Sequence, residues 1–178
     1  MIPNVVLNWS NEYPDFKYLK AQCMDVYAAN NKFNQCMLQT ADPEKNDWEH
    51  GVGQTILYEN FNPRTICHIQ PSLKDTEIEK FFKWLEVPVW RTRLMMAPVK
   101  SVYSLHADGD FRLHLPIYTN DNCYFLFPES HPKAEMWHMP ANGRVHWANT
   151  RRVHTMMNAS LTEGRLHMVM CADILINI

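Results

Sequence analysis

From residue 91 onward the sequence reads RTRLMMAP (91–98), SVYSLHA (101–107), FRLHLPIYT (111–119), CYFLF (123–127), RVHWAN (144–149) and RLHMVMCADILI (165–176). These runs are short, rich in apolar and β-favouring residues, and broken by Pro, Gly, Asn or Asp. Strands separated by turn-forming residues are typical of antiparallel β-structure. The second half of the chain is therefore predicted to be all-β.

Two segments of the first half have helical periodicity instead. In YPDFKYLKAQCMDVYAA (13–29) and in SLKDTEIEKFFKWLE (72–86), the apolar residues fall on one face of a helix. The second helix is expected to begin at Ser72, whose hydroxyl can cap free backbone N–H groups. Asp75, three residues further on, lies where a negative charge favours the start of a helix. Both helices are predicted to pack outside the β-structure.

The remaining segments complete the predicted architecture. GQTILYE (53–59) is interpreted as another strand, whereas segments 40–52 and 128–143 are polar, contain proline and are predicted to be loops. The strands suffice for two facing sheets, so the fold class is mainly β: a double-stranded β-helix (jelly roll, cupin-like) with supporting α-helices in the N-terminal half.

The length of 178 residues is that of one ordinary domain. Residues 1–178 are predicted to form a single domain. Residues 1–88 would supply the helical support and the first strands. Residues 89–178 would supply the jelly-roll core and its functional site.

Composition excludes several classes of partner. Seventeen basic and nineteen acidic residues give a net charge of −2 without any basic block, so we expect no nucleic-acid partner. Five cysteines without a CxxC pair indicate buried, reduced thiols and a cytoplasmic location. The N-terminus has no secretory pattern and no run approaches the ~20 apolar residues of a membrane span, so no membrane partner is expected. The sequence indicates no oligomeric state.

The first chemical motif is His106-Ala-Asp108. Alternate side chains of an extended strand face the same way, so His106 and Asp108 would point together into one concavity and bind adjacent positions on a metal ion. An HxD pair on its own is a weak signal, because the chain contains nine histidines. A surface or core histidine is the alternative interpretation.

A second histidine strengthens the metal hypothesis. His154 lies in the strand-like run NTRRVHTMMN (149–158). Two imidazoles and one carboxylate on one face would leave three coordination positions open for a bidentate keto acid and O2. His106, Asp108 and His154 are therefore the predicted catalytic metal ligands.

Arg165 follows eleven residues after His154 and begins a run that could form a strand beside the one that carries this histidine. A guanidinium forks onto a carboxylate through two hydrogen bonds, which suits the far end of 2-oxoglutarate. Arg165 is the predicted cosubstrate anchor. An exposed surface arginine is the alternative.

The series RTRLMMAP, HAD, FRLHLPIYTN, NTRRVHTMMN and EGRLHMVMCAD resembles the 2-oxoglutarate and iron(II)-dependent dioxygenases. Within them it is most similar to the aspartyl/asparaginyl β-hydroxylase-like group, which includes bacterial hydroxylases of free proline. The resemblance covers residues 90–173. It implies that His106, Asp108 and His154 bind Fe(II), that Arg165 pairs with 2-oxoglutarate, and that Arg112 and His114 contact this cosubstrate too.

The resemblance also bears on the substrate. Members of the group that act on protein domains tend to lack the metal carboxylate, whereas Asp108 supplies one here, as in the free-proline hydroxylases. Asn158 matches a recurrent asparagine of the pattern and could be structural or catalytic.

The function expected from this resemblance is a dioxygenase that uses Fe(II), 2-oxoglutarate and O2 to hydroxylate an aliphatic C–H of an amino acid or amino-acid side chain. It would release succinate and CO2. Its partner would be a small-molecule or peptide substrate. The alternatives are a cupin-type metal enzyme without 2-oxoglutarate and a non-catalytic jelly-roll binding module.

Arg91 and Arg93 precede the HxD motif on a predicted strand. One of them could face the cavity and bind a substrate carboxylate, although the same alternation could send both to solvent. Four further histidines are interpreted as ordinary: His131, His138, His146 and His167.

Overall fold

The computed structural model describes residues 2–53, 61–129 and 133–174. The strands of its large sheet are, in spatial order, β1 (Val5–Val6), β10 (His146–Ala148), β7 (Phe111–Tyr118), β12 (Arg165–Ala172), β5 (Trp90–Ala97) and β2 (Gln35–Met37). A second sheet contains β6 (Ser101–Val102), β11 (Thr155–Asn158), β8 (Cys123–Phe127) and β9 (Glu135–Trp137). The short strands β3 (Gln39–Thr40) and β4 (His68–Ile69) pair separately.

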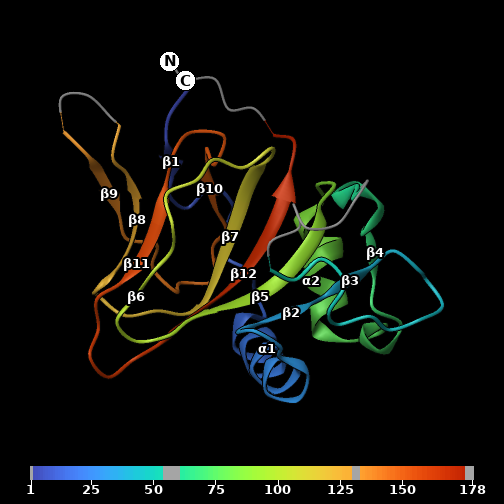
Figure 1. The fold of residues 1–178 in the computed structure, drawn as a ribbon. Coiled ribbons are helices and arrows are strands. Elements are labelled where there is room, and N and C mark those ends of the chain that lie inside the picture. Colours follow the sequence, from blue (N-terminus) through green and yellow to red (C-terminus); the bar gives the residue numbers. More distant parts are fainter. Residues whose placement is uncertain (1, 54–60, 130–132, 175–178) are drawn as a thin grey trace.

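All of these strand pairs are antiparallel. The two larger sheets face each other, and the helices lie against the other side of the large sheet (Figure 1). The protein is thus mainly β, with the double-stranded β-helix that the sequence predicted. Few elements other than strands occur among the described residues.

The alternation of side chains along the strands separates two environments. The central strand β12 pairs with β7, so that Met170 lies opposite Leu113 and Met168 opposite Leu115. These four side chains are fully buried in the main core, together with apolar side chains of the helices. Burying a large apolar side chain contributes about 1.5–3 kcal/mol to stability. The apolar layer between the large sheet and the helices therefore fixes the position of the sheet.

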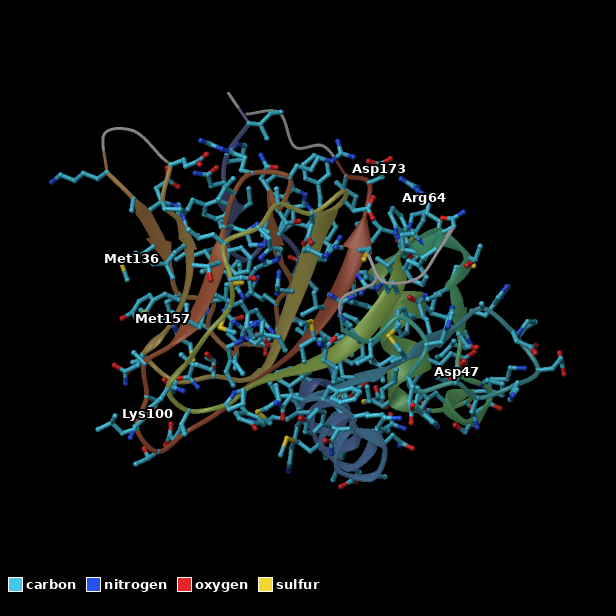
Figure 2. The ribbon with its side chains drawn as sticks, in the orientation of Figure 1. Asp47, Arg64, Lys100, Met136, Met157 and Asp173 are labelled. Carbon is cyan, nitrogen blue, oxygen red and sulfur yellow. The ribbon has the colours of Figure 1, made fainter. Side chains whose placement is uncertain are left out.

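The opposite face of the large sheet looks into the interior of the jelly roll. A smaller apolar cluster joins the sheets there, and it includes Ala97 from β5, Phe125 from β8 and Met156 from β11. The rest of this inner face is unusually polar for an interior, with buried arginines and histidines on β5, β7 and β12. Figure 2 shows the side chains between the sheets, whereas Met136 and Met157 lie on the outer side of the second sheet.

Helix α1 (Phe16–Asn30) forms where the sequence predicted it and buries Leu19 and Cys23. Helix α2 (Glu77–Leu85) buries Ile78, Phe81 and Leu85, spaced at three and four residues as on one helical face. The two helices pack against each other and against the large sheet. Two short 3₁₀ helices, Pro63–Thr65 and Pro71–Leu73, precede α2.

The predicted start of α2 at Ser72 is wrong. Ser72 lies in the second 3₁₀ helix, and its hydroxyl donates to Asn46 Oδ1 at 3.1 Å instead of capping α2. Asp75 has a φ of +62°, a left-handed conformation that interrupts any helix passing through it. The helix therefore begins after Thr76, and the Glu79 carboxylate accepts the Asp75 N–H at 2.9 Å.

Other predictions for individual segments have mixed outcomes. The run 135–137, assigned to a loop, forms strand β9 because its backbone pairs with β8. The predicted strand 53–59 falls almost entirely on residues 54–60, which lie outside the described residues. Of the five free cysteines four are buried, but Cys67 is exposed, contrary to expectation. No helix of the described chain is long and apolar enough to cross a membrane.

Candidate metal centre

Two histidines far apart in the sequence lie side by side at the mouth of the jelly roll. His106 and His154 form an isolated antiparallel bridge, in which the His106 N–H donates to the His154 carbonyl at 3.1 Å and the reverse bond measures 2.9 Å. Directly opposed residues of such a pair project to the same side. Their ring centroids are accordingly 4.4 Å apart.

Asp108 completes a group of three possible ligands. Its Oδ1 lies 3.9 Å from His106 Nε2, and its Oδ2 lies 4.0 Å from His154 Nε2. One ligand atom from each residue falls within 4.8 Å of the others. Among the described residues this is the group of histidine, cysteine and acidic side chains that could hold a metal ion.

The backbone orients both imidazoles. His106 Nδ1 lies 2.7 Å from the Ser104 carbonyl, and His154 Nδ1 lies 2.9 Å from the Arg152 carbonyl. A carbonyl can only accept, so each Nδ1 carries a proton, and in the neutral imidazole this leaves the lone pair of Nε2, the nitrogen nearer to Asp108, for a metal ion. Outer hydrogen bonds of this kind fix the tautomer of metal-binding histidines.

The surroundings of His154 favour its neutral form. Its side chain is only 4% exposed, and its ring stacks on Phe125 with an interplanar angle of 12°. Burial lowers the pKa of His154 below its usual value, although the Arg152 carbonyl and Asp108 act in the opposite direction. A neutral imidazole is the form that binds a metal ion.

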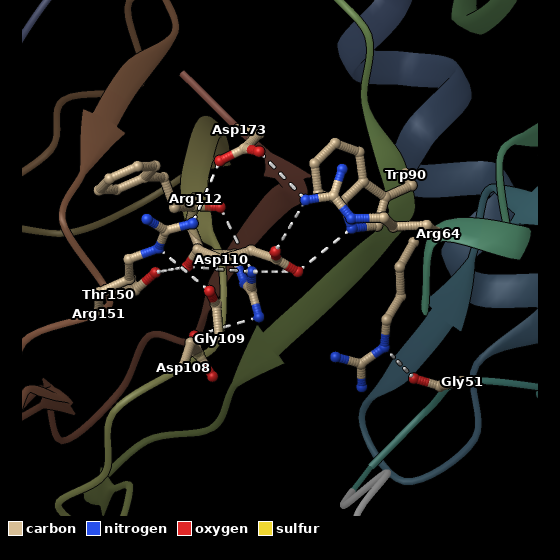
Figure 3. A network of polar contacts seen from close by, with 12 residues as sticks. Gly51, Arg64, Trp90, Asp108, Gly109, Asp110, Arg112, Thr150, Arg151 and Asp173 are labelled. Carbon is tan, nitrogen blue, oxygen red and sulfur yellow. Dashed lines mark hydrogen bonds and ion pairs between the residues drawn. The ribbon is translucent and has the colours of Figure 1, made fainter. Parts of the chain in front are cut away.

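Arg112 connects the candidate centre to a network of ion pairs (Figure 3). Its Nη2 lies 3.2 Å from Asp108 Oδ2, and its Nη1 lies 3.9 Å from Asp110 Oδ2. Asp110 also accepts a hydrogen bond from Trp90 Nε1 and lies 3.7 Å from Arg64 Nη2. The Asp108 N–H donates to the Thr150 carbonyl at 2.7 Å. The backbone of Asp108 is thus fixed by this hydrogen bond and its carboxylate by the ion pair with Arg112.

Arg165 lies deeper in the same cavity. The residue is 5% exposed, its Nε has no hydrogen-bond partner, and no carboxylate of the described residues lies within ion-pair distance. Burial lowers the pKa of Arg165 to about 10, which leaves it charged at neutral pH. A buried cation without a counter-ion is costly, so this end of the cavity is suited to an anion.

His114 also lines this cavity, and both of its ring nitrogens are buried without a partner. Burial, and then the charge of Arg165, holds the pKa of His114 well below its usual range. His167, for which the sequence predicted no role, has the same unpartnered nitrogens and lies 5.8 Å from His114 between ring centroids. Two neutral imidazoles thus lie near Arg165, His114 on the same cavity and His167 on a second, smaller one that Arg165 also lines.

The structure positions these residues differently from what the sequence predicted. His106 and Asp108 were expected on one regular strand, but only His106 forms a bridge and Asp108 lies in the following loop. The strand of Arg165, β12, was expected beside the strand that carries His154. Instead β12 lies between β5 and β7 in the large sheet, and His154 immediately precedes β11 in the second sheet. Arg165 therefore reaches the cavity from across the jelly roll.

Further residues line the cavity that no local sequence pattern revealed. They are brought there by the pairing of distant strands, and they include Met95 and Val169 from the large sheet, Phe125 and Met156 from the second sheet, and Tyr103 from the loop between them. Arg112, predicted to contact the cosubstrate, lines the same cavity, but its observed ion pairs are to Asp108 and Asp110.

The fold and the site together define a jelly roll with two histidines and one carboxylate at its open end. No family model and no curated protein sequence matches the chain. A non-heme monooxygenase solved as a ThoJ–Ni complex is similar over 95% of this chain and 73% of its own, with 14% identity and a TM-score of 0.50.

A 2OG-Fe(II) oxygenase family oxidoreductase from Burkholderia pseudomallei gives a TM-score of 0.39 at 17% identity. That match covers 56% of this chain and 53% of the other protein. The similarity to the monooxygenase supports the jelly-roll fold. The resemblance to the aspartyl/asparaginyl β-hydroxylase-like group stays a prediction.

Proposed function

We propose that this protein is an Fe(II)- and 2-oxoglutarate-dependent oxygenase that hydroxylates an aliphatic C–H of an amino acid or amino-acid side chain. One observation carries the proposal: the His106, Asp108 and His154 group shares its cavity with the buried, unpaired guanidinium of Arg165. A metal enzyme without an acidic cosubstrate has no need of this cation, and a binding module has no need of the ligand group.

The donor set suits iron(II). Two imidazole nitrogens and one carboxylate form the facial arrangement of non-heme iron oxygenases, with positions left open for other ligands. His106, Asp108 and His154 would hold the iron. Bound iron supplies the activation of O2, and the oxidative decarboxylation of 2-oxoglutarate to succinate and CO2 supplies the electrons for that step.

The protein's own groups would position the reactants. Arg165 would bind the distal carboxylate of 2-oxoglutarate, and the neutral His114, which lines the same cavity, would be available to donate a hydrogen bond without adding charge. Arg112 neutralises part of the charge on Asp108 and holds its carboxylate toward the histidines. Phe125 stacks on His154, and together with Met156 it gives the cavity an apolar lining that would limit the access of water to the centre.

The metal assignment is tested by anaerobic Fe(II) titration. The wild type should bind one Fe(II), and Asp108→Ala should weaken binding by more than the about 10–100-fold that loss of an outer hydrogen-bond partner costs. Asp121→Ala, at an exposed turn, is the matched control and should bind normally. Unchanged Fe(II) affinity in Asp108→Ala would refute this ligand set.

The cosubstrate assignment is tested by succinate production from 2-oxoglutarate when O2 is admitted, with and without a panel of L-amino acids that includes proline. Arg165→Leu should raise the Kd for 2-oxoglutarate by about 10–100-fold, since two charge-assisted hydrogen bonds are lost. Iron binding without any 2-oxoglutarate binding would favour a cupin-type enzyme. Absence of both would favour a binding module.

A further inference from the structure

A second buried arginine faces the candidate centre without a counter-ion. Arg93, on β5, is 8% exposed and lines both the inner cavity and the outer cleft that leads to it. Its Nη1 has no hydrogen-bond partner, and its Nε points at the thioether of Met95, 3.0 Å away. No carboxylate of the described chain lies within 4.0 Å of its guanidinium.

The other arginines of the cleft have partners. Arg91, two residues earlier on the same strand, donates to the carbonyls of Gly51 at 2.9 Å and Gly53 at 3.2 Å. Arg112 pairs with Asp108 and Asp110. Arg91 thus fixes a loop and Arg112 fixes an aspartate, whereas no structural task of this kind is visible for Arg93.

Arg93 is also separate from the proposed 2-oxoglutarate anchor. Strands β5 and β12 pair so that Arg93 lies opposite Val169 and Ala97 opposite Arg165. Four residues along a strand correspond to about 13 Å, so the two arginines extend from well-separated points of one sheet face. Of the two carboxylates of 2-oxoglutarate, one would bind the metal and the other Arg165, which leaves none for Arg93.

An unpaired cation in the interior is destabilising unless an interaction compensates for its lost hydration. Burial, followed by the charge of Arg91, lowers the pKa of Arg93 to about 9, and the guanidinium therefore stays largely charged at neutral pH. Its position at the junction of cavity and cleft is accessible to a molecule that approaches the metal from outside.

We propose that Arg93 binds a carboxylate of the substrate, and hence that the substrate is a carboxylate-bearing small molecule or a peptide with an acidic group near the reacting carbon. This inference rests on the proposed function, because that function assigns the other two anion positions of the cavity. The guanidinium would orient the substrate, with its carboxylate on β5 and the reacting C–H toward His106 and Asp108.

Paired ligands test the proposal. The Fe(II) protein is kept anaerobic with saturating 2-oxoglutarate, and thermal unfolding is followed with L-amino acids, short peptides and aliphatic monocarboxylic acids, each beside its own amide. At least one acid should raise the Tm saturably, and its neutral amide should bind at least about tenfold more weakly. In Arg93→Met this preference should disappear while the shift caused by 2-oxoglutarate persists.

A stability comparison excludes a merely structural role. Without ligands, Arg93→Met should leave the Tm unchanged or raise it, because it removes an unpaired buried charge. The same substitution at Arg91 should lower the Tm by several degrees, because the Gly51 and Gly53 carbonyls lose their donors. If Arg93→Met does not fold, Arg93→Lys keeps the charge without the fork and should show a weakened preference for the acid.

The outcomes separate the two proposals. If 2-oxoglutarate does not shift the Tm of the wild type, the proposed function fails. If it does, but no acid binds, or acid and amide bind equally, or Arg93→Met binds the acid like the wild type, then only the role of Arg93 is overturned.

Discussion

Asn158 offers a quantitative test of how the scaffold holds the site. This residue ends β11, is fully buried, and matches the recurrent asparagine of the sequence pattern, for which both a structural and a catalytic role were open. Its Nδ2 lies 2.9–3.1 Å from the carbonyls of Ala97, Pro98 and Glu163. Its Oδ1 accepts the Ser160 N–H at 3.1 Å. The contacts support the structural role.

The free-energy cost of Asn158→Ala follows from these contacts. A net hydrogen bond contributes about 1 kcal/mol, and a buried carbonyl left without a donor costs about 1–3 kcal/mol more. The Asn158 NH2 group has two hydrogens to share among the three carbonyls, and its Oδ1 also accepts from Asn120 Nδ2 at 3.4 Å. When these bonds are lost and water hydrates part of the site, we expect the free energy of unfolding to fall by about 3–5 kcal/mol. Asn158→Asp, which places a carboxylate against three carbonyls, should cost at least as much.

The assay is equilibrium unfolding in urea, with the m-value measured for each variant. Asn11→Ala, at an exposed position, is the control and should change the free energy of unfolding by less than about 0.5 kcal/mol. A loss below about 1 kcal/mol for Asn158→Ala at an unchanged m-value would refute the structural role. Because the Glu163 carbonyl lies just before Arg165, the folded variant should also bind 2-oxoglutarate more weakly.

Three further predictions concern thiols, acid and a turn. In the native protein a thiol reagent should label Cys67 alone among the described cysteines, because the others are buried. Burial also raises the pKa of Cys36 to about 12, so rapid labelling of Cys36 would contradict this packing. Burial lowers the pKa of His146 to about 4 from 6.5, so the unfolded chain binds a proton that the folded one does not between these values. The free energy of unfolding of the metal-free protein should therefore fall as the pH decreases from 6.5 to 4, with up to about 3 kcal/mol of the loss due to His146. If urea unfolding gives the same free energy over that pH range, the prediction is contradicted. Gly143 has a φ of +74°, and an added Cβ would lie 3.0 Å from Glu12 Cγ, so Gly143→Ala should lower the free energy of unfolding by about 2 kcal/mol or more. Gly53→Ala, at φ +75° with open space around the added Cβ, should lower it by about 1 kcal/mol. Equal costs for the two variants would contradict the steric argument.

Much of the architecture follows from local patterns. Strands β5, β7, β8 and β12 lie where short apolar runs predicted them, because alternation and turn residues are local properties of the chain. The failures concern features that no local pattern encodes. The start of α2 depends on the left-handed φ of Asp75, and β9 exists only because β8 provides a partner for a polar segment.

The sequence by itself determined which side chains are available to the candidate site. His106, Asp108, His154 and Arg165 were selected by chemical type, spacing and resemblance, and the structure brings all four to one cavity. Their kinds fix the chemistry that is possible there, since imidazole, carboxylate and guanidinium bind metals and acids whatever scaffold carries them.

Only the tertiary structure decided how these groups act together. Pairing of β12 between β5 and β7 brings Arg165 to the centre from the sheet opposite His154, and the fold commits Arg112 to aspartates while it leaves Arg93 and Arg165 unpaired. Whether a charged side chain has a partner depends on residues far away in the chain, because burial and counter-ions are set by long-range packing and not by neighbouring residues.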